Sequence, residues 1–306
     1  QARDTKVVPT RAAKASSWVT RAINMMLKRC LLIFVLCLLP GGPAWAEGIS
    51  LARIPHIYEV AIDPARPGHL ILATPRGLYR LTPEIEMQPL LDESHDVTGL
   101  VVSDNGKFLL VSGKKKNKSF GVMFSGDAGK TWKSHSSAMD GSAPLRLMKV
   151  AGPKGRLLAV GNGLFQSLDA GKSWSNVGQM PPGSLSLATN HKSSKKLLAA
   201  TNKGLKASSD RGKSWQSVSV GPKGKPASMV ARDGHNRPWT FIVSAGLFAR
   251  TAPDKWEKRL DSKQFDGAII QLTGSKSDPR RLIALTQYMK LLQSLDDGRT
   301  WQAFGK

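Results

Sequence analysis

Short apolar runs recur along the chain after residue 56, and polar links rich in Gly, Pro, Asp, Asn and Ser separate them. Examples of the runs are HLILAT, KFLLVS and KLLAAT, and examples of the links are SDNGK and NHKSSKK. Runs of four to seven residues bounded by turn residues are typical of β-strands, and no stretch here keeps a helical spacing. The pattern therefore predicts an all-β protein with many short strands and turns.

The predicted strands recur as one unit of about 43 residues. The third strand of each unit reads GLYRL, GVMFS, GLFQS, GLKAS, GLFAR or KLLQS, beginning at residues 77, 121, 163, 204, 246 and 290. Two apolar runs precede each of these segments, and a fourth strand follows. Four antiparallel strands, named A to D, repeated six times predict a six-bladed β-propeller over residues 47–306. The sequence leaves open whether residues 48–53 add a strand to the last blade.

Four units share a polar phrase, S-x-D-x-G-x-[ST]-W, between strands C and D. Its Asp can accept hydrogen bonds from the turn backbone, and its Gly suits a position with positive φ. The Trp is expected to bury its ring between neighbouring blades. The first and fifth units lack the phrase, although Trp256 keeps the Trp position to within one residue. The residues of the phrase are Asp127, Gly129 and Trp132; Asp169, Gly171 and Trp174; Asp210, Gly212 and Trp215; and Asp296, Gly298 and Trp301.

The phrase resembles the Asp-box, also called the BNR repeat, and the resemblance covers all of residues 47–306. Proteins similar to this include sialidases, the luminal domain of sortilin, and the assembly and stability factors of photosystem II. The resemblance implies that the Asp-boxes are structural turns on the C–D hairpins, opposite the face that binds ligand. One Asp in each turn offers too few oxygens for calcium, so no metal and no cofactor are expected.

The first 46 residues differ from the repeats. The basic pair Lys28-Arg29 precedes the apolar run LLIFVLCLL, and PGGPAWA follows it. This order predicts a secretory signal peptide over residues 26–46, cleaved near Ala46, because the apolar run is too short to span a bilayer. Residues 1–25 are interpreted as an unstructured upstream extension or an over-extended start. We expect export to the periplasm or to the exterior of the cell.

Composition limits the chemistry of the exported part. Both cysteines, Cys30 and Cys37, lie in the signal segment, which excludes disulfides and thiol chemistry from residues 47–306. Those residues carry 38 Lys and Arg against 21 Asp and Glu, a net charge of about +17. Such an excess favours attraction to anionic surfaces. The expected partner of this exported monomer is a protein complex, a membrane surface bound peripherally, or an acidic polymer, rather than nucleic acid.

The B–C and D–A links share one face of a propeller, and proteins of this type normally bind there. The B–C link SGKKKNKSFG (112–121) is expected to be a ten-residue loop with four lysines. The A–B links are basic as well, and the alternative interpretation is that these lysines are simply solvated. The predicted basic binding surface consists of Arg53, Arg76, Lys114, Lys115, Lys116, Lys118, Lys203, Tyr288 and Lys290.

A glycoside hydrolase of sialidase-like type is the alternative function. Arg53-Ile54-Pro55 resembles the N-terminal Arg-Ile-Pro motif of sialidases, in which the Arg holds a substrate carboxylate. The two further arginines of that family have no counterpart in the later units, and no Glu follows Glu257 to accompany Tyr288, the only late Tyr. No catalytic residue is assigned, and we expect a binding or assembly scaffold rather than an enzyme.

Overall fold

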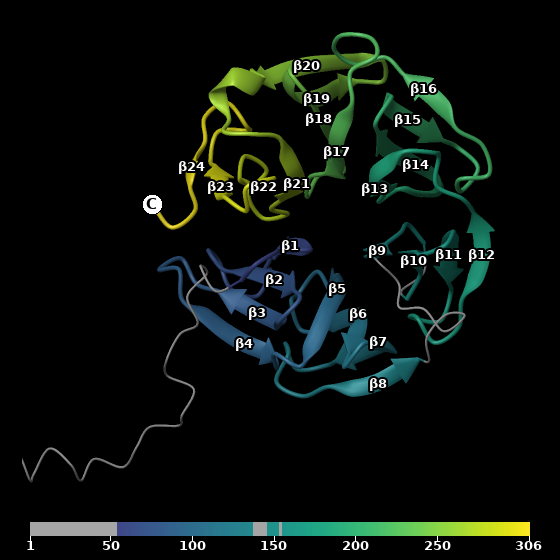
Figure 1. Ribbon diagram of the computed structural model, residues 1–306, viewed down its shortest axis with the longest axis vertical. Coiled ribbons are helices and arrows are strands. Elements are labelled where there is room, and N and C mark those ends of the chain that lie inside the picture. Colours follow the sequence, from purple (N-terminus) through teal and green to yellow (C-terminus); the bar gives the residue numbers. More distant parts are fainter. Residues whose placement is uncertain (1–53, 137–145, 153–154) are drawn as a thin grey trace, which may run out of the picture. The chain divides into compact units, whose positions relative to one another are not determined.

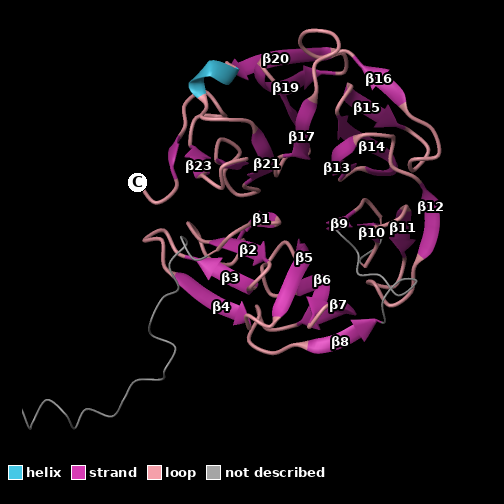
Figure 2. Cartoon of the chain, viewed as in Figure 1, coloured by secondary structure: helices cyan, strands magenta, loops and turns pink. Residues whose placement is uncertain are grey.

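The computed structural model describes residues 54–136, 146–152 and 155–306. These residues form six four-stranded antiparallel sheets around a central axis, so the predicted six-bladed β-propeller is confirmed (Figure 1). Within the described part the only helical turn is η3 (Ser262–Gln264), which joins the last two blades (Figure 2). The predicted signal peptide and the upstream extension lie outside the described residues.

Each blade takes four consecutive strands, with strand A nearest the axis and strand D at the rim (Figure 1). Blades 1 to 3 comprise β1 (Glu59–Ile62), β2 (Leu70–Thr74), β3 (Gly77–Leu81), β4 (Met87–Leu91); β5 (His95–Val102), β6 (Leu109–Lys115), β7 (Lys118–Ser125), β8 (Lys133–Ser136); β9 (Arg146–Lys149), β10 (Leu157–Val160), β11 (Leu164–Ser167) and β12 (Ser175–Gly178). Blades 4 to 6 comprise β13 (Ser184–Asn190), β14 (Ser193–Thr201), β15 (Gly204–Ser208), β16 (Gln216–Val218); β17 (Ala227–Arg232), β18 (Pro238–Ile242), β19 (Gly246–Ala252), β20 (Lys255–Leu260); β21 (Ile269–Gly274), β22 (Leu282–Thr286), β23 (Leu291–Ser294) and β24 (Gln302–Ala303).

The core consists of layers between adjacent blades. Every residue of β2, β18 and β22 is buried, because a middle strand packs against a neighbouring blade on each of its two faces. This explains why the B strands read as continuous apolar runs instead of alternating with polar residues. Ile71 of blade 1, for example, packs with Leu109 and Val111 of blade 2.

The four S-x-D-x-G phrases form the same hydrogen-bonded turn. In blade 3 the Oγ of Ser167 donates to Asp169 Oδ1 at 2.8 Å and accepts the N–H of Gly171 at 2.7 Å. Asp169 also accepts from the N–H and the Oγ of Ser173, at 2.9 and 2.6 Å. Ala170 and Gly171 both have positive φ, 64° and 94°. The buried Ser, to which the sequence analysis assigned no role, therefore connects the two halves of the turn.

The Trp of each phrase is half-buried and lies toward the preceding blade. Trp132 donates its Nε1–H to the carbonyl of Leu90 in blade 1 at 2.7 Å. Trp215 donates to the carbonyl of Gln179, in the link that leads out of blade 3, at 2.9 Å. The largest fully buried side chain is a different one, Trp239 of β18, whose Nε1–H donates to Asp233 at 3.0 Å.

The ring closes between blade 6 and blade 1. The described strands of each of these blades come from one continuous segment, so side chains connect the two blades. Leu72 and Tyr79 of blade 1 share an apolar cluster with Ile283 and Leu285 of blade 6. Gln271 accepts the N–H of Val60 at 3.0 Å and donates to the carbonyl of Tyr58. Residues 48–53, which the sequence analysis considered for a closing strand, lie outside the described residues.

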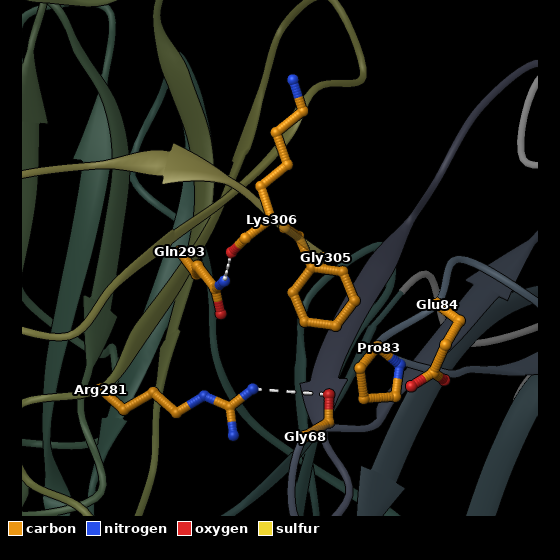
Figure 3. Close-up of a pocket in the computed structure, with 8 residues that line it drawn as sticks. Gly68, Pro83, Glu84, Arg281, Gln293, Gly305 and Lys306 are labelled. Carbon is orange, nitrogen blue, oxygen red and sulfur yellow. Dashed lines mark hydrogen bonds between the residues drawn. The ribbon is translucent and has the colours of Figure 1, made fainter.

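Figure 3 shows the outer part of this seam, where a surface pocket of about 320 Å³ separates the two blades. Arg281 of blade 6 crosses it to donate to the carbonyl of Gly68 in blade 1 at 3.4 Å. Pro83 and Glu84 of blade 1 face Gln293 of blade 6 across the same pocket. The seam thus combines apolar packing between the blades with hydrogen bonds from Gln271 at the inner strands and from Arg281 at the pocket.

The Asp turns make stability depend on pH. Hydrogen bonds from Thr131 and Ser125 lower the pKa of Asp127 to about 2, and bonds from Thr300 and Ser294 do the same for Asp296. A folded-state pKa below the ordinary value of about 3.9 means that the ionised Asp stabilises the fold above pH ~4. This contribution is lost as the pH falls toward 2.

We therefore expect a variant with Asn at positions 127, 169, 210 and 296 to lose less stability than the wild type between pH 5 and pH 2. The variant should be the less stable protein at pH 6, and the difference between the two unfolding temperatures should narrow as the pH falls to 2. Thermal unfolding followed by circular dichroism over this range measures both curves. Parallel curves would show that these carboxylates do not contribute through ionisation.

Replacing Gln271 tests the closure of the ring. Gln271→Ala leaves the Val60 N–H and the Tyr58 carbonyl without their partner, which is expected to lower the free energy of unfolding by about 1–2 kcal/mol. Gln293→Ala removes a side chain that binds only the exposed Lys306 carbonyl, and it should cost less than about 0.5 kcal/mol. Urea denaturation of the two variants provides the comparison, and equal losses would contradict a special role for Gln271.

Candidate binding surface

Antiparallel strands in sequence order place the B–C turns and D–A links on one face, here called the B–C face. The A–B and C–D links lie on the opposite face, called the A–B face. Arg76, Lys203 and Lys290 all lie at B–C turns, of blades 1, 4 and 6. The four lysines of blade 2 share this face with them. Arg53 lies outside the described residues.

Blade 2 carries a hairpin where the sequence analysis expected a ten-residue loop. Strands β6 and β7 continue to Lys115 and Lys118, and only Lys116 and Asn117 form the turn, with φ of 49° and 62°. The expectation was wrong because two consecutive residues with positive φ make a tight turn that continues strand pairing to its tip. Residues 114–118, here called the lysine hairpin, are all exposed.

The lysine hairpin extends further than the other B–C turns. Strand β7 begins three residues before Gly121, whereas β3, β15 and β19 begin at the equivalent glycines, Gly77, Gly204 and Gly246. Three strand residues span about 10 Å. The four ammonium groups are therefore carried on a projecting strand pair rather than on a flat surface.

The base of the hairpin is held in place by close packing. Gly113 has φ of 159°, and a Cβ on it would lie 1.9 Å from the carbonyl oxygen of Asp96. The buried ring of His95 packs edge-on against Phe120, with ring centres 5.8 Å apart. His95 Nδ1 also lies 3.0 Å from Asp92 Oδ1. These contacts from β5 and the D–A link fix the direction of the projecting strands.

The remaining predicted cations are partly neutralised. Arg76 forms an ion pair with Glu93, and Lys290 forms one with Asp266, in both cases with a carboxylate from a D–A link. Among the described residues, no carboxylate forms an ion pair with Lys115, Lys116 or Lys118. Tyr288, on the B–C turn of blade 6, is 58% exposed. The lysine hairpin therefore brings four exposed lysines together on this face, while Lys203 is exposed on another blade and Lys223, Lys225 and Lys263 are exposed in D–A links.

A polar cluster at the axis was missed by the sequence analysis. Arg146 of β9 donates through Nη2 to Glu59 Oε1 of β1 at 3.0 Å, and its Nε lies 2.9 Å from Oε2. The Glu59 side chain is 16% exposed, and burial raises its pKa more than Arg146 lowers it. The ion pair joins blade 1 to blade 3, past the inner strand of blade 2.

A second pair of polar groups is Tyr58 and Asp96, which lie near each other, and burial raises the pKa of both. Lys114, the strand partner of Asp96, partly opposes the shift at the carboxyl group. The sequence contained a signal for this cluster, because two short inner strands begin with a charged residue, Glu59 in β1 and Arg146 in β9.

This arrangement is a mostly buried ion pair, with a tyrosine and a second carboxyl group nearby. The Glu59 carboxylate is paired with Arg146, whereas a glycosidase needs a pair of carboxyl groups facing its substrate. In the described part of the chain, no group of three or more His, Cys, Asp and Glu side chains could hold a metal ion. No helix within that part is long and apolar enough to cross a membrane.

Comparison with known proteins identifies the fold. No protein-family model and no curated protein matches the sequence. Among solved structures, the chain is similar to the GH74 enzyme of Niastella koreensis (TM-score 0.57, 15% identity), covering 81% of this chain and 45% of that one. It is also similar to YCF48 bound to D1 peptide (0.54, 16%, covering 88% and 87%) and to YCF48 from Cyanidioschyzon merolae (0.54, 16%, covering 81% and 84%).

These similarities define the class of protein, a β-propeller. The chain spans less than half of the length of the GH74 enzyme and most of the length of the YCF48 structures. The solved structures with TM-scores of 0.5 or more are 13–17% identical to this chain. At this level of identity the similarity shows a shared fold and nothing about function.

The contribution of the axial ion pair can be tested by removing the arginine that pairs with Glu59. Arg146→Met leaves Glu59 without its cation, and we expect a loss of about 2–4 kcal/mol in unfolding free energy at pH 7.5. The loss should be smaller at pH 5.5, because a carboxyl group with a raised folded-state pKa takes up a proton as the pH falls. The double variant Glu59→Gln/Arg146→Met removes both charges and should recover to within about 1 kcal/mol of the wild type. Urea unfolding measures all three, and a pH-independent loss would contradict the assignment.

Proposed function

We propose that this protein is an exported, non-catalytic binding or assembly scaffold whose lysine hairpin recognises an anionic surface of a partner protein complex. The observation that carries the proposal is the projecting strand pair of residues 114–118, with three ammonium groups that no described carboxylate neutralises. Because the backbone of the lysine hairpin is already ordered by strand pairing, binding a partner costs little backbone conformational entropy.

Two further observations support this function. Arg76 and Lys290 are paired with carboxylates on the same face, so they attract an approaching anion less than the unpaired lysines of the hairpin do. In addition, one similar solved propeller, of nearly the same length, is described as YCF48 bound to D1 peptide. A propeller of this size can therefore present a peptide-binding surface.

The glycosidase alternative has no second observation in its favour. Its motif depends on Arg53, which lies outside the described residues, and the axial carboxylate Glu59 is paired with Arg146. The GH74 enzymes that share the fold are about twice as long as this chain. Turnover of a fluorogenic glycoside by the purified protein would favour the alternative.

Replacing the three free lysines tests the scaffold function. We expect Lys115→Gln/Lys116→Gln/Lys118→Gln to bind immobilised poly-glutamate about tenfold more weakly in 50 mM salt, at ~0.5 kcal/mol for each exposed charge. The difference should shrink in 500 mM salt because of screening. A partner complex that co-purifies with the wild type from the native cell envelope should no longer co-purify with this variant.

The matched control removes three lysines from the Asp turns of the opposite face, Lys130, Lys172 and Lys213, which are exposed as well. This control has the same net charge as the hairpin variant and should retain its partner. Equal weakening by both variants would mean that overall charge, rather than the hairpin, governs binding.

A further inference from the structure

The inner strands of the six blades all run in the same direction, so their carboxyl ends surround the axis on the A–B face (Figure 1). Strands β9 and β17 end at Lys149 and Arg232. The links that follow β5, β13 and β21 carry Asp104, His191 and Lys276. These five residues, one from each of blades 2 to 6, are called the axial mouth.

One carboxylate bridges two cations in the axial mouth. Asp104 Oδ1 accepts from Lys149 Nζ and from Lys276 Nζ, each at 2.5 Å. These two hydrogen bonds lower the pKa of Asp104 to about 2. The side chains of Asp104, Lys149 and Lys276 are 63%, 45% and 51% exposed, so all three can be reached from solvent.

The axial mouth has more positive charge than Asp104 neutralises. His191 has a lowered pKa, because of partial burial and of the nearby cations Lys276, Arg232 and Lys149. Arg232 donates through Nη1 to the carbonyl of Asn236 at 2.8 Å, while its buried Nε–H has no hydrogen-bond partner among the described residues. Three cations and a histidine therefore surround one carboxylate. The cluster retains an attraction for a further anion.

We propose that the axial mouth binds carboxylate side chains of an acidic peptide segment, and that Asp104 is an internal competitor for the same position. Asp104 itself demonstrates that one carboxylate oxygen fits between the ammonium groups of Lys149 and Lys276. A peptide carboxylate that displaces Asp104 gains these two partners, and a second acidic residue reaches Arg232 and His191. The site lies on the face opposite the lysine hairpin and does not depend on it.

The test titrates an acetylated and amidated tri-glutamate peptide into the intact protein. Asp104→Asn keeps the shape of the side chain but frees both lysines, and it is expected to bind the peptide at least fivefold more tightly than the wild type. Asp254→Asn, on the same face, makes the same change in net charge and should leave the affinity within twofold. Lys149→Gln/Lys276→Gln should weaken binding at least fivefold.

A site-specific signal completes the experiment. The imidazole resonance of His191, assigned by its loss in His191→Gln, should titrate at a higher pH when the peptide is bound, since a nearby anion favours the protonated ring. The variant that lacks Lys115, Lys116 and Lys118 should give the same peptide affinity and the same shift. That result separates this site from the proposed function of the hairpin.

Three outcomes would overturn the proposal. If Asp104→Asn and Asp254→Asn bind the peptide equally, Asp104 is not a competitor. If His191 does not respond to the peptide, binding occurs elsewhere. If inorganic phosphate shifts His191 and competes at equal concentration of the two ligands, the site recognises a free oxyanion rather than a peptide.

Discussion

The packing of blade 6 against blade 1 is the contact on which the rest of the structure depends. Each of these blades builds its described strands from its own segment of the chain, so apolar side chains and Gln271, rather than a shared strand, join the two ends of the ring. Both axial clusters draw residues from blades that are not neighbours, and they exist only while the ring is closed. A weaker seam would therefore lower stability and also separate the charged groups at the axis.

The two faces differ in how much their turns vary between blades. On the A–B face, four blades repeat one turn in which a buried Ser, an Asp and a left-handed Gly share the same hydrogen bonds. On the B–C face, turn length and charge differ from blade to blade, and blade 2 extends its strands into the lysine hairpin. Repetition serves stability, since each copy closes its own hairpin, whereas variation leaves single blades able to acquire a binding role.

Ion pairs within the fold determine which of the many cations remain available to bind an external anion. Arg76, Lys290 and Arg146 each contact a carboxylate from another part of the fold. Arg76 and Lys290 each pair with a carboxylate from a D–A link, and Arg146 of blade 3 pairs with Glu59 of blade 1. The net charge of the chain is strongly positive, yet part of its positive charge is compensated within the fold.

The sequence by itself determined the blade number, the order of strands and the Asp turns. These features depend on residues a few positions apart, as in the bonds from Ser173 to Asp169, and therefore appear as a local pattern that repeats. Only the tertiary structure decided the length of the lysine hairpin and the pairing of charges. Glu59 and Arg146 are 87 positions apart, and Asp104 and Lys276 are 172 apart. Electrostatic interaction depends on distance through space, which ring closure sets and no local pattern contains.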